Sequence, residues 1–101
     1  MNPLWEESEF IFCDLQATAR FIGPRRSRRR AFFEAAYDSF EFVARNPGIG
    51  RKRADLGFPD VRSWRIDGFR RYLIFNREFS DRIQIWRVLH GARDLHQRLN
   101  E

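Results

Sequence analysis

The sequence predicts a single α+β domain over residues 1–101. Two N-terminal helices are expected to form a hairpin on one face of a three- to four-stranded antiparallel sheet, followed by a short C-terminal helix. Three observations lead to this fold class. Apolar residues recur at helical spacing in the first part of the chain, the period changes to that of strands in the second part, and glycine and proline residues separate the two parts.

The first part contains two helical segments separated by Gly23 and Pro24. Glu9–Ile22 is predicted to be a helix capped by Ser8, because apolar residues lie on one face of it: Ile11, Leu15 and Ile22. Pro24–Arg45 is predicted to be the second helix, with one polar stripe formed by Glu34, Asp38, Glu41 and Arg45. The helix has an arginine-rich start, but from Ala31 to Ala44 nearly all its other side chains are apolar. We therefore expect it to be covered on most sides by the first helix, the sheet and a partner chain.

The second part contains three segments rich in β-branched and aromatic residues, which predict strands at Val61–Ile66, Tyr72–Arg77 and Arg82–His90. Asp67-Gly68 is a hairpin signal, so the strands are expected to form an antiparallel meander whose second face stays open. Asn2–Glu6 is long enough for a short additional strand. Ala92–Asn100 is long enough for a short helix.

Composition limits the classes of protein that the chain can belong to. Hydrophobic content of 43% argues against disorder, a single cysteine excludes an internal disulfide, and no apolar run is long enough to cross a membrane. We expect a cytoplasmic protein without a signal peptide. Residues 51–101 carry eleven Arg and one Lys against seven acids, a net charge of +5, whereas residues 1–50 are neutral. A basic half-domain favours nucleic acids, nucleoprotein assemblies or acidic proteins as partners, although an arginine-rich composition also has this effect without function.

Basic side chains in the second half are the candidates for a functional site. Cleavage of RNA by internal attack needs a base, an acid and cations that stabilise charge on the phosphate. Histidine exchanges protons near neutral pH, and the fork of donors on arginine suits phosphate. The available residues are Arg62, Arg65, Arg71, Arg87, Arg93 and His90.

Strand alternation distinguishes some of these candidates. Arg87 shares a face with Ile83 and Ile85, so it is expected to point inward unless a bulge intervenes, and to need an acidic partner, either Asp14 or Asp94. Arg65 alternates with two residues that are expected to face the core, Trp64 and Ile66, and is therefore predicted on the open face. His90 is interpreted either as an acid or base, or as a structural residue that bonds to the backbone or to Asp94.

One long motif resembles a known family. The run Ile83-Gln84-Ile85-Trp86-Arg87-Val88-Leu89-His90-Gly91-Ala92-Arg93-Asp94 is similar to the last strand of ParE-type toxins, in which I-x-I-x-R-V-L-H-G-x-R-D is typical. Arg70–Phe75 resembles the preceding strand, and Asp14-Leu15, Asn46–Gly50 and Val61-Arg62 fit the same pattern. The chain is identified as resembling the ParE/RelE superfamily, closer to ParE, over roughly residues 8–96.

The resemblance implies the toxin of a type II toxin–antitoxin system, which binds a cognate, ParD-like antitoxin. The ParE branch is linked to inhibition of DNA gyrase, whereas the RelE branch cuts messenger RNA on the ribosome, and the shared fold does not separate them. RelE-like ribonucleases usually carry a tyrosine near the C-terminus, and Leu95–Glu101 contains none. This favours a non-catalytic gyrase inhibitor. A ribosome-dependent endoribonuclease and a member that has lost toxicity remain as alternatives.

Two sets of site residues follow from these alternatives. In an inhibitor, contacts with the target or the antitoxin are expected from Arg65, Arg71, Trp86, His90 and Arg93. In a ribonuclease, the catalytic residues would be Arg62, Arg65, Arg87 and His90. The antitoxin is expected to use an acidic, amphipathic segment. Two His and one Cys suggest no metal site, no cofactor is expected, and the basic run Arg25–Arg30 is either a solvated helix start or a nucleic-acid contact.

Overall fold

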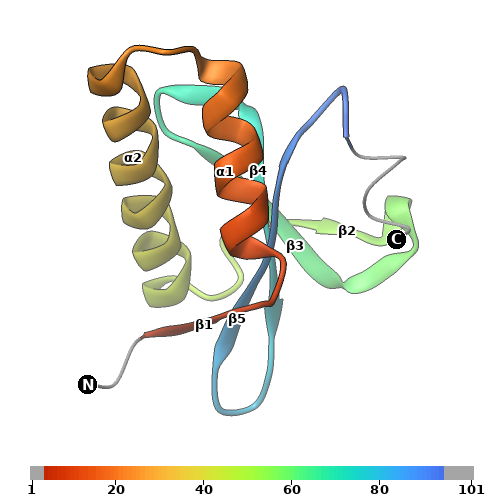
Figure 1. The fold of residues 1–101 in the computed structure, drawn as a ribbon. Coiled ribbons are helices and arrows are strands. Elements are labelled where there is room, and N and C mark those ends of the chain that lie inside the picture. The colour runs from red at the N-terminus through yellow and green to blue at the C-terminus, as the bar shows by residue number, and fades with distance from the viewer. Residues whose placement is uncertain (1–3, 95–101) are drawn as a thin grey trace.

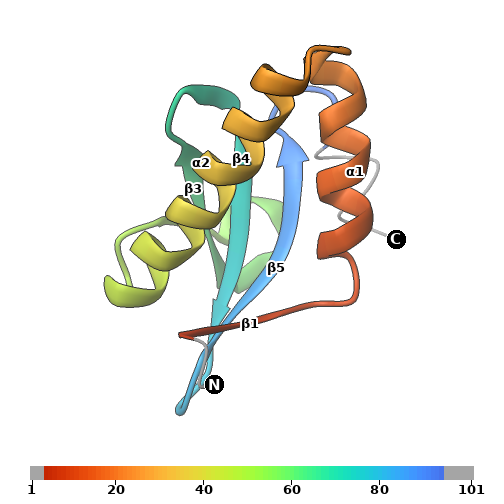
Figure 2. The same ribbon diagram turned by 60° about the vertical axis from the view of Figure 1, so that its left-hand side comes forward.

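The computed structural model describes residues 4–94, which form two helices and a five-stranded sheet. The helices lie on the same side of the sheet, as Figures 1 and 2 show from two directions. In chain order the elements are β1 (Trp5–Glu7), α1 (Ile11–Ile22), α2 (Arg26–Arg45), β2 (Arg51–Arg53), a 3-10 turn (Ala54–Leu56), β3 (Phe58–Ile66), β4 (Phe69–Glu78) and β5 (Ile83–His90). The predicted α+β class and helical hairpin are therefore confirmed.

The sheet has the strand order β1-β5-β4-β3-β2. The three predicted strands correspond to β3, β4 and β5 and form the expected antiparallel meander. The prediction of three or four antiparallel strands was wrong in two respects. β2 adds an antiparallel strand at one edge, and β1 pairs in parallel with β5 at the other, so that the sheet is mixed.

The main core lies between the helices and the sheet. Phe32, Phe40 and Val43 of α2 pack with Ile11 and Leu15 of α1 on a layer of strand residues: Ile66, Tyr72, Ile74, Ile83, Ile85 and Val88. Fully burying an aromatic or aliphatic side chain of this size contributes about 1.5–3 kcal/mol. This packing holds the helical hairpin on the sheet.

The sequence predicted that the second face of the sheet stays open, but in the structure this face is partly covered. Val61, Phe75 and Leu89 form a smaller buried cluster there. Leu56 and Phe58, which follow β2, pack against this cluster together with Leu73 and Trp86. Among residues 4–94, the chain between β2 and β3 thus covers only part of this face.

The ends of the elements differ in detail from the predictions. Ser8 lies three residues before the first residue of α1, and its Oγ accepts a hydrogen bond from the backbone N–H of Phe10 at 3.2 Å rather than capping the helix itself. Gly91–Asp94 form a turn, so the predicted helix over Ala92–Asn100 does not begin at Ala92, and its residues from 95 onward lie outside the described part. No helix within residues 4–94 is long and apolar enough to cross a membrane.

Candidate functional site

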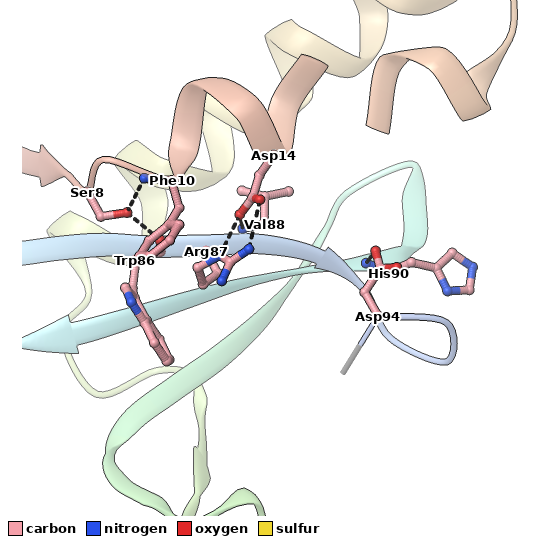
Figure 3. A network of polar contacts seen from close by, with 8 residues as sticks. All are labelled: Ser8, Phe10, Asp14, Trp86, Arg87, Val88, His90 and Asp94. Atoms are coloured by element: carbon pink, nitrogen blue, oxygen red, sulfur yellow. Dashed lines mark hydrogen bonds and ion pairs between the residues drawn. The ribbon is translucent and has the colours of Figure 1, made fainter. Parts of the chain in front are cut away.

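A buried ion pair joins α1 to β5. Arg87 donates from Nε to Asp14 Oδ2 at 2.9 Å and from Nη2 to Asp14 Oδ1 at 3.1 Å, and the backbone N–H of Val88 donates to Asp14 Oδ2 at 3.0 Å (Figure 3). The two side chains are only 2% and 1% exposed. The guanidinium also lies 4.3 Å from the ring centroid of Phe10. Of the two acids considered from sequence, Asp14 holds Arg87, and the pair ties α1 to the sheet.

A β-bulge changes the alternation of β5. Phe75 pairs with Arg87 and Asn76 pairs with Ile85, so that Trp86 is an extra residue on β5. Val88 consequently joins Ile83 and Ile85 in the helix-side core, and Leu89 lies in the cluster on the other face. Strict alternation would have placed Leu89 with the two isoleucines.

Trp86 belongs to the second face of the sheet. Its ring centroid lies 5.2 Å from that of Phe58, and the guanidinium of Arg77 lies 4.3 Å from its ring. Figure 3 shows the indole on the opposite side of β5 from Asp14. Trp86, a predicted contact residue, is partly buried and already packed against its neighbours.

The end of β5 is held by its own hydrogen bonds. Asp94 Oδ2 accepts from the backbone N–H of His90 at 3.1 Å, and Nδ1 of His90 accepts from the backbone N–H groups of Ala92 and Arg93 at 3.2 and 3.0 Å. Because Nδ1 is an acceptor, the hydrogen-bond pattern assigns the ring proton to Nε2. Figure 3 shows the ring of His90 directed away from the Asp14–Arg87 pair.

Arg93 is also engaged within this turn. It donates from Nε to Asp94 Oδ1 at 3.0 Å, and this bond raises the pKa of Arg93 above its ordinary value. Its guanidinium lies 3.8 Å from the ring centroid of Phe21 at the end of α1. Arg93 therefore joins the end of β5 to α1, although its side chain remains 37% exposed.

Two further arginines are fixed near β2. Arg62 donates from Nη1 to the carbonyl oxygens of Gly48 and Gly50 at 3.1 and 2.9 Å, which holds the chain after α2. Arg53, which the sequence did not single out, is buried and forms two hydrogen bonds to Asp55 and one to Ser63. The hydrogen bonds that Arg53 donates to Asp55 are the largest cause that lowers the pKa of the Asp55 carboxyl group.

An open cleft of about 940 Å³ lies between α2 and β3; we call it the α2–β3 cleft. Apolar side chains from three parts of the chain line it, namely Phe42, Ile49 and Trp64. Arg51, Arg65 and Arg70 lie around it. β2 pairs with β3 only as far as Ser63, so residues 64–66 have no strand beside them on this edge within the described chain.

A smaller pocket of about 440 Å³ adjoins the cleft; we call it the arginine pocket. Its charged and polar lining consists of Arg65 from β3, Arg70 and Arg71 from β4, and His90 from β5. Arg65 pairs across the strands with Leu73, which packs on the second face, so Arg65 lies on that face as its alternation with Trp64 and Ile66 indicated. Arg70 was not among the predicted site residues, because nothing in its local pattern distinguishes it from its neighbours.

The structure thus separates the residues proposed for ribonuclease chemistry. Arg65 and His90 line one pocket. Arg87 is buried against Asp14, and Arg62 is bound to backbone carbonyls after α2. Within residues 4–94, no group of three or more His, Cys, Asp or Glu side chains is arranged to hold a metal ion. The arrangement is suited to binding an anionic partner, because its arginines supply donors and positive charge.

The structure is that of a small α+β domain with a helical hairpin on one side of its sheet and several arginines around the cleft and the pocket. The family model for the ParE toxin of the type II toxin–antitoxin system, parDE, matches residues 13–95. The chain belongs to this family and is a ParE-type toxin of the ParE/RelE superfamily. Membership implies an antitoxin partner in a type II system. No curated protein sequence matches the chain.

Proposed function

We propose that this toxin acts by binding rather than by catalysis, that its target is DNA gyrase, and that a cognate ParD-like antitoxin neutralises it. The family match supports a toxin of a type II system. The observation that carries the non-catalytic part is the burial of Arg87 against Asp14, both at most 2% exposed, which removes this arginine from any surface site. His90 is likewise engaged, since its Nδ1 accepts hydrogen bonds from two backbone N–H groups of the turn that follows β5.

The α2–β3 cleft is the proposed docking site for the antitoxin. Its apolar lining, including Phe42 and Trp64, suits the apolar face of an amphipathic segment. The arginines beside it suit the acidic face of the same segment. Because Arg65, Arg70 and Leu73 line both the cleft and the arginine pocket, a segment bound in the cleft would also obstruct the pocket.

Expression of the chain in cells tests the proposed target. We expect growth arrest together with loss of negative DNA supercoiling or induction of DNA damage, and restored growth when the antitoxin is co-expressed. Rapid cleavage of messenger RNA with unchanged DNA topology would contradict the proposal. It would support the RelE-like endoribonuclease alternative, for which Arg65 and His90 lie in one pocket. Absence of any effect on growth would contradict a toxic function.

Arg65→Glu tests whether the basic surface takes part. Arg65 is exposed and its guanidinium has no ion pair within residues 4–94, so we expect the variant to remain folded. Reversal of charge at this position should weaken growth arrest or antitoxin binding by about tenfold, since charge pairs across interfaces contribute on the order of one to several kcal/mol. Arg20→Glu, at an exposed position in the last turn of α1, is the matched control. A folded Arg65→Glu protein that arrests growth and binds antitoxin as the control does would refute this role.

A further inference from the structure

The arginines of the sheet fall into two groups according to their partners. Most are held by groups of the protein itself: Arg53 by Asp55, Arg62 by backbone carbonyls, Arg77 by Asp60, Arg82 by Glu6 and Asp81, Arg87 by Asp14 and Arg93 by Asp94. The guanidinium groups of Arg65, Arg70 and Arg71 form no hydrogen bond or ion pair with any residue in the described range 4–94. All three line the arginine pocket.

The lining of the arginine pocket contains no carboxylate among the described residues. Three arginines without an ion pair in the described chain line one hollow, so their positive charges repel one another, and an anion in the hollow would relieve that repulsion. For the other arginines named above, acids or backbone carbonyl oxygens provide this compensation. The charge that would complete this pocket is therefore expected from a ligand.

The shape of the pocket is set by backbone contacts rather than by the arginines. Gly91 donates its N–H to the carbonyl oxygen of Arg71 at 2.7 Å, and the turn that follows is held by Nδ1 of His90. This arrangement leaves Nε2–H as the only ring N–H donor of His90. The pocket is thus lined by arginines and bordered by a turn that its own hydrogen bonds hold in place.

We propose that the arginine pocket binds a phosphodiester group of a nucleic-acid strand. Guanidinium forks donate in pairs to phosphate oxygens, and successive phosphates along a strand supply negative charge over a longer surface than one carboxylate does. A volume of about 440 Å³ is large for a single carboxylate. The inference goes beyond the proposed function and does not require gyrase to be the target, since it concerns the purified toxin and a bare strand.

An acidic peptide is the less favoured occupant of this pocket. Peptides bind mainly through apolar or aromatic anchors, and these side chains lie in the α2–β3 cleft, where Phe42, Ile49 and Trp64 are found. Among the described residues, the lining of the arginine pocket has two apolar side chains, Leu73 and Ala92. The two hollows therefore suit different ligands, even though they share Arg65 and Arg70.

The test compares two triple variants that remove the same charge. One replaces the pocket arginines (Arg65→Gln, Arg70→Gln, Arg71→Gln). The other replaces exposed helix arginines that have no ion pair within the described chain (Arg20→Gln, Arg26→Gln, Arg30→Gln). Circular dichroism and thermal melting establish that both are folded. Binding of fluorescein-labelled single-stranded DNA, duplex DNA and RNA of one sequence is then measured by anisotropy over a series of salt concentrations.

We expect the pocket triple to bind at least about tenfold more weakly than the wild type, because at least one charge-assisted hydrogen bond is lost. For duplex DNA, a plot of the logarithm of the association constant against the logarithm of the salt concentration has a negative slope. The steepness of this slope should decrease by about 0.9 for each phosphate contact removed. The helix triple should change affinity several times less. If the pocket triple loses affinity for DNA and RNA alike, the pocket recognises the phosphodiester group alone. If it loses affinity for only one of them, the proposal is supported and the preferred nucleic acid is identified.

Three results would overturn the proposal. The wild type could fail to bind any of the oligonucleotides at low salt. The two triples could lose the same affinity, which would assign binding to total charge or to the basic start of α2. Finally, poly-glutamate could bind in a pocket-dependent manner while the oligonucleotides show no such dependence, which would assign the pocket to an acidic protein partner.

Discussion

Removal of Asp14 should destabilise the protein more than removal of any surface acid. In Asp14→Ala, Arg87 stays in a position that is 2% exposed, without the carboxylate that accepts from its Nε and Nη2. The backbone N–H of Val88 also loses its acceptor. Breaking a buried pair by removing one partner costs about 3–5 kcal/mol. That is a large part of the roughly 5–15 kcal/mol by which such domains are stable.

The assays are unfolding by urea and by heat, each followed by tryptophan fluorescence and circular dichroism. A loss of about 3–5 kcal/mol corresponds to a fall in Tm of about 12–40 °C for a domain of this size. Glu41→Gln is the matched control, because it breaks the Arg45–Glu41 pair, whose side chains are 61% and 48% exposed. An exposed pair at this helical spacing contributes only about 0.3–0.5 kcal/mol.

A double-mutant cycle separates the loss of the pair from the loss of packing. In Asp14→Ala combined with Arg87→Met, no charge is left buried, so the double variant should be more stable than Asp14→Ala alone. The reasoning would be refuted if Asp14→Ala cost no more than Glu41→Gln. It would also be refuted if the two changes at Asp14 and Arg87 were simply additive.

Two further predictions concern the edge of the sheet formed by β2. Asp55 has a pKa below its ordinary value of 3.8, because Arg53 donates hydrogen bonds to its carboxylate. The ionised carboxylate therefore stabilises the fold fully above pH 3.8, and this contribution is lost as the pH falls through the lowered pKa. The difference in urea midpoint between wild type and Asp55→Asn should therefore shrink below about pH 4, and a pH-independent difference would contradict this. Gly50→Ala should lower the free energy of unfolding by about 1–3 kcal/mol, because the added Cβ would lie 2.7 Å from the carbonyl oxygen of Ser63. Gly91→Ala, with its nearest contact at 3.4 Å to a flexible side chain, is the control in the same melting experiment, and equal losses would refute the steric argument.

The longer elements could be predicted because their periods extend over many residues. α2 spans 20 residues, and each strand of the meander carries enough β-branched and aromatic residues to be recognised. β2 was not predicted, and β1 was predicted only as a possible short strand at Asn2–Glu6, since each strand has three residues. Arg51–Arg53 is a charged triplet without alternation, and Trp5–Glu7 becomes a strand only by pairing with Ile83–Ile85, which is far away in the sequence.

The partner of Arg87 shows a second limit of reasoning from sequence. Alternation along β5 predicted that Arg87 is buried and needs an acid, and both Asp14 and Asp94 were suitable. The choice depends on the bulge at Trp86, which shifts the register with β4 by one residue, and on the position of α1 above β5. Both features arise from tertiary packing, and no local pattern of the chain encodes them.

The same limit explains why the arginine pocket was only partly visible in the sequence. Eighteen arginines are distributed along the chain, and their spacing does not say which of them have partners. The structure gives most arginines of the sheet a carboxylate or a carbonyl oxygen and leaves Arg65, Arg70 and Arg71 without either in the described chain. If an arginine-rich composition alone explained the positive charge of this half of the chain, arginines without a partner would be expected to lie scattered over the surface. Their convergence on one hollow, beside a turn held by backbone bonds, favours a ligand as the reason for their charge.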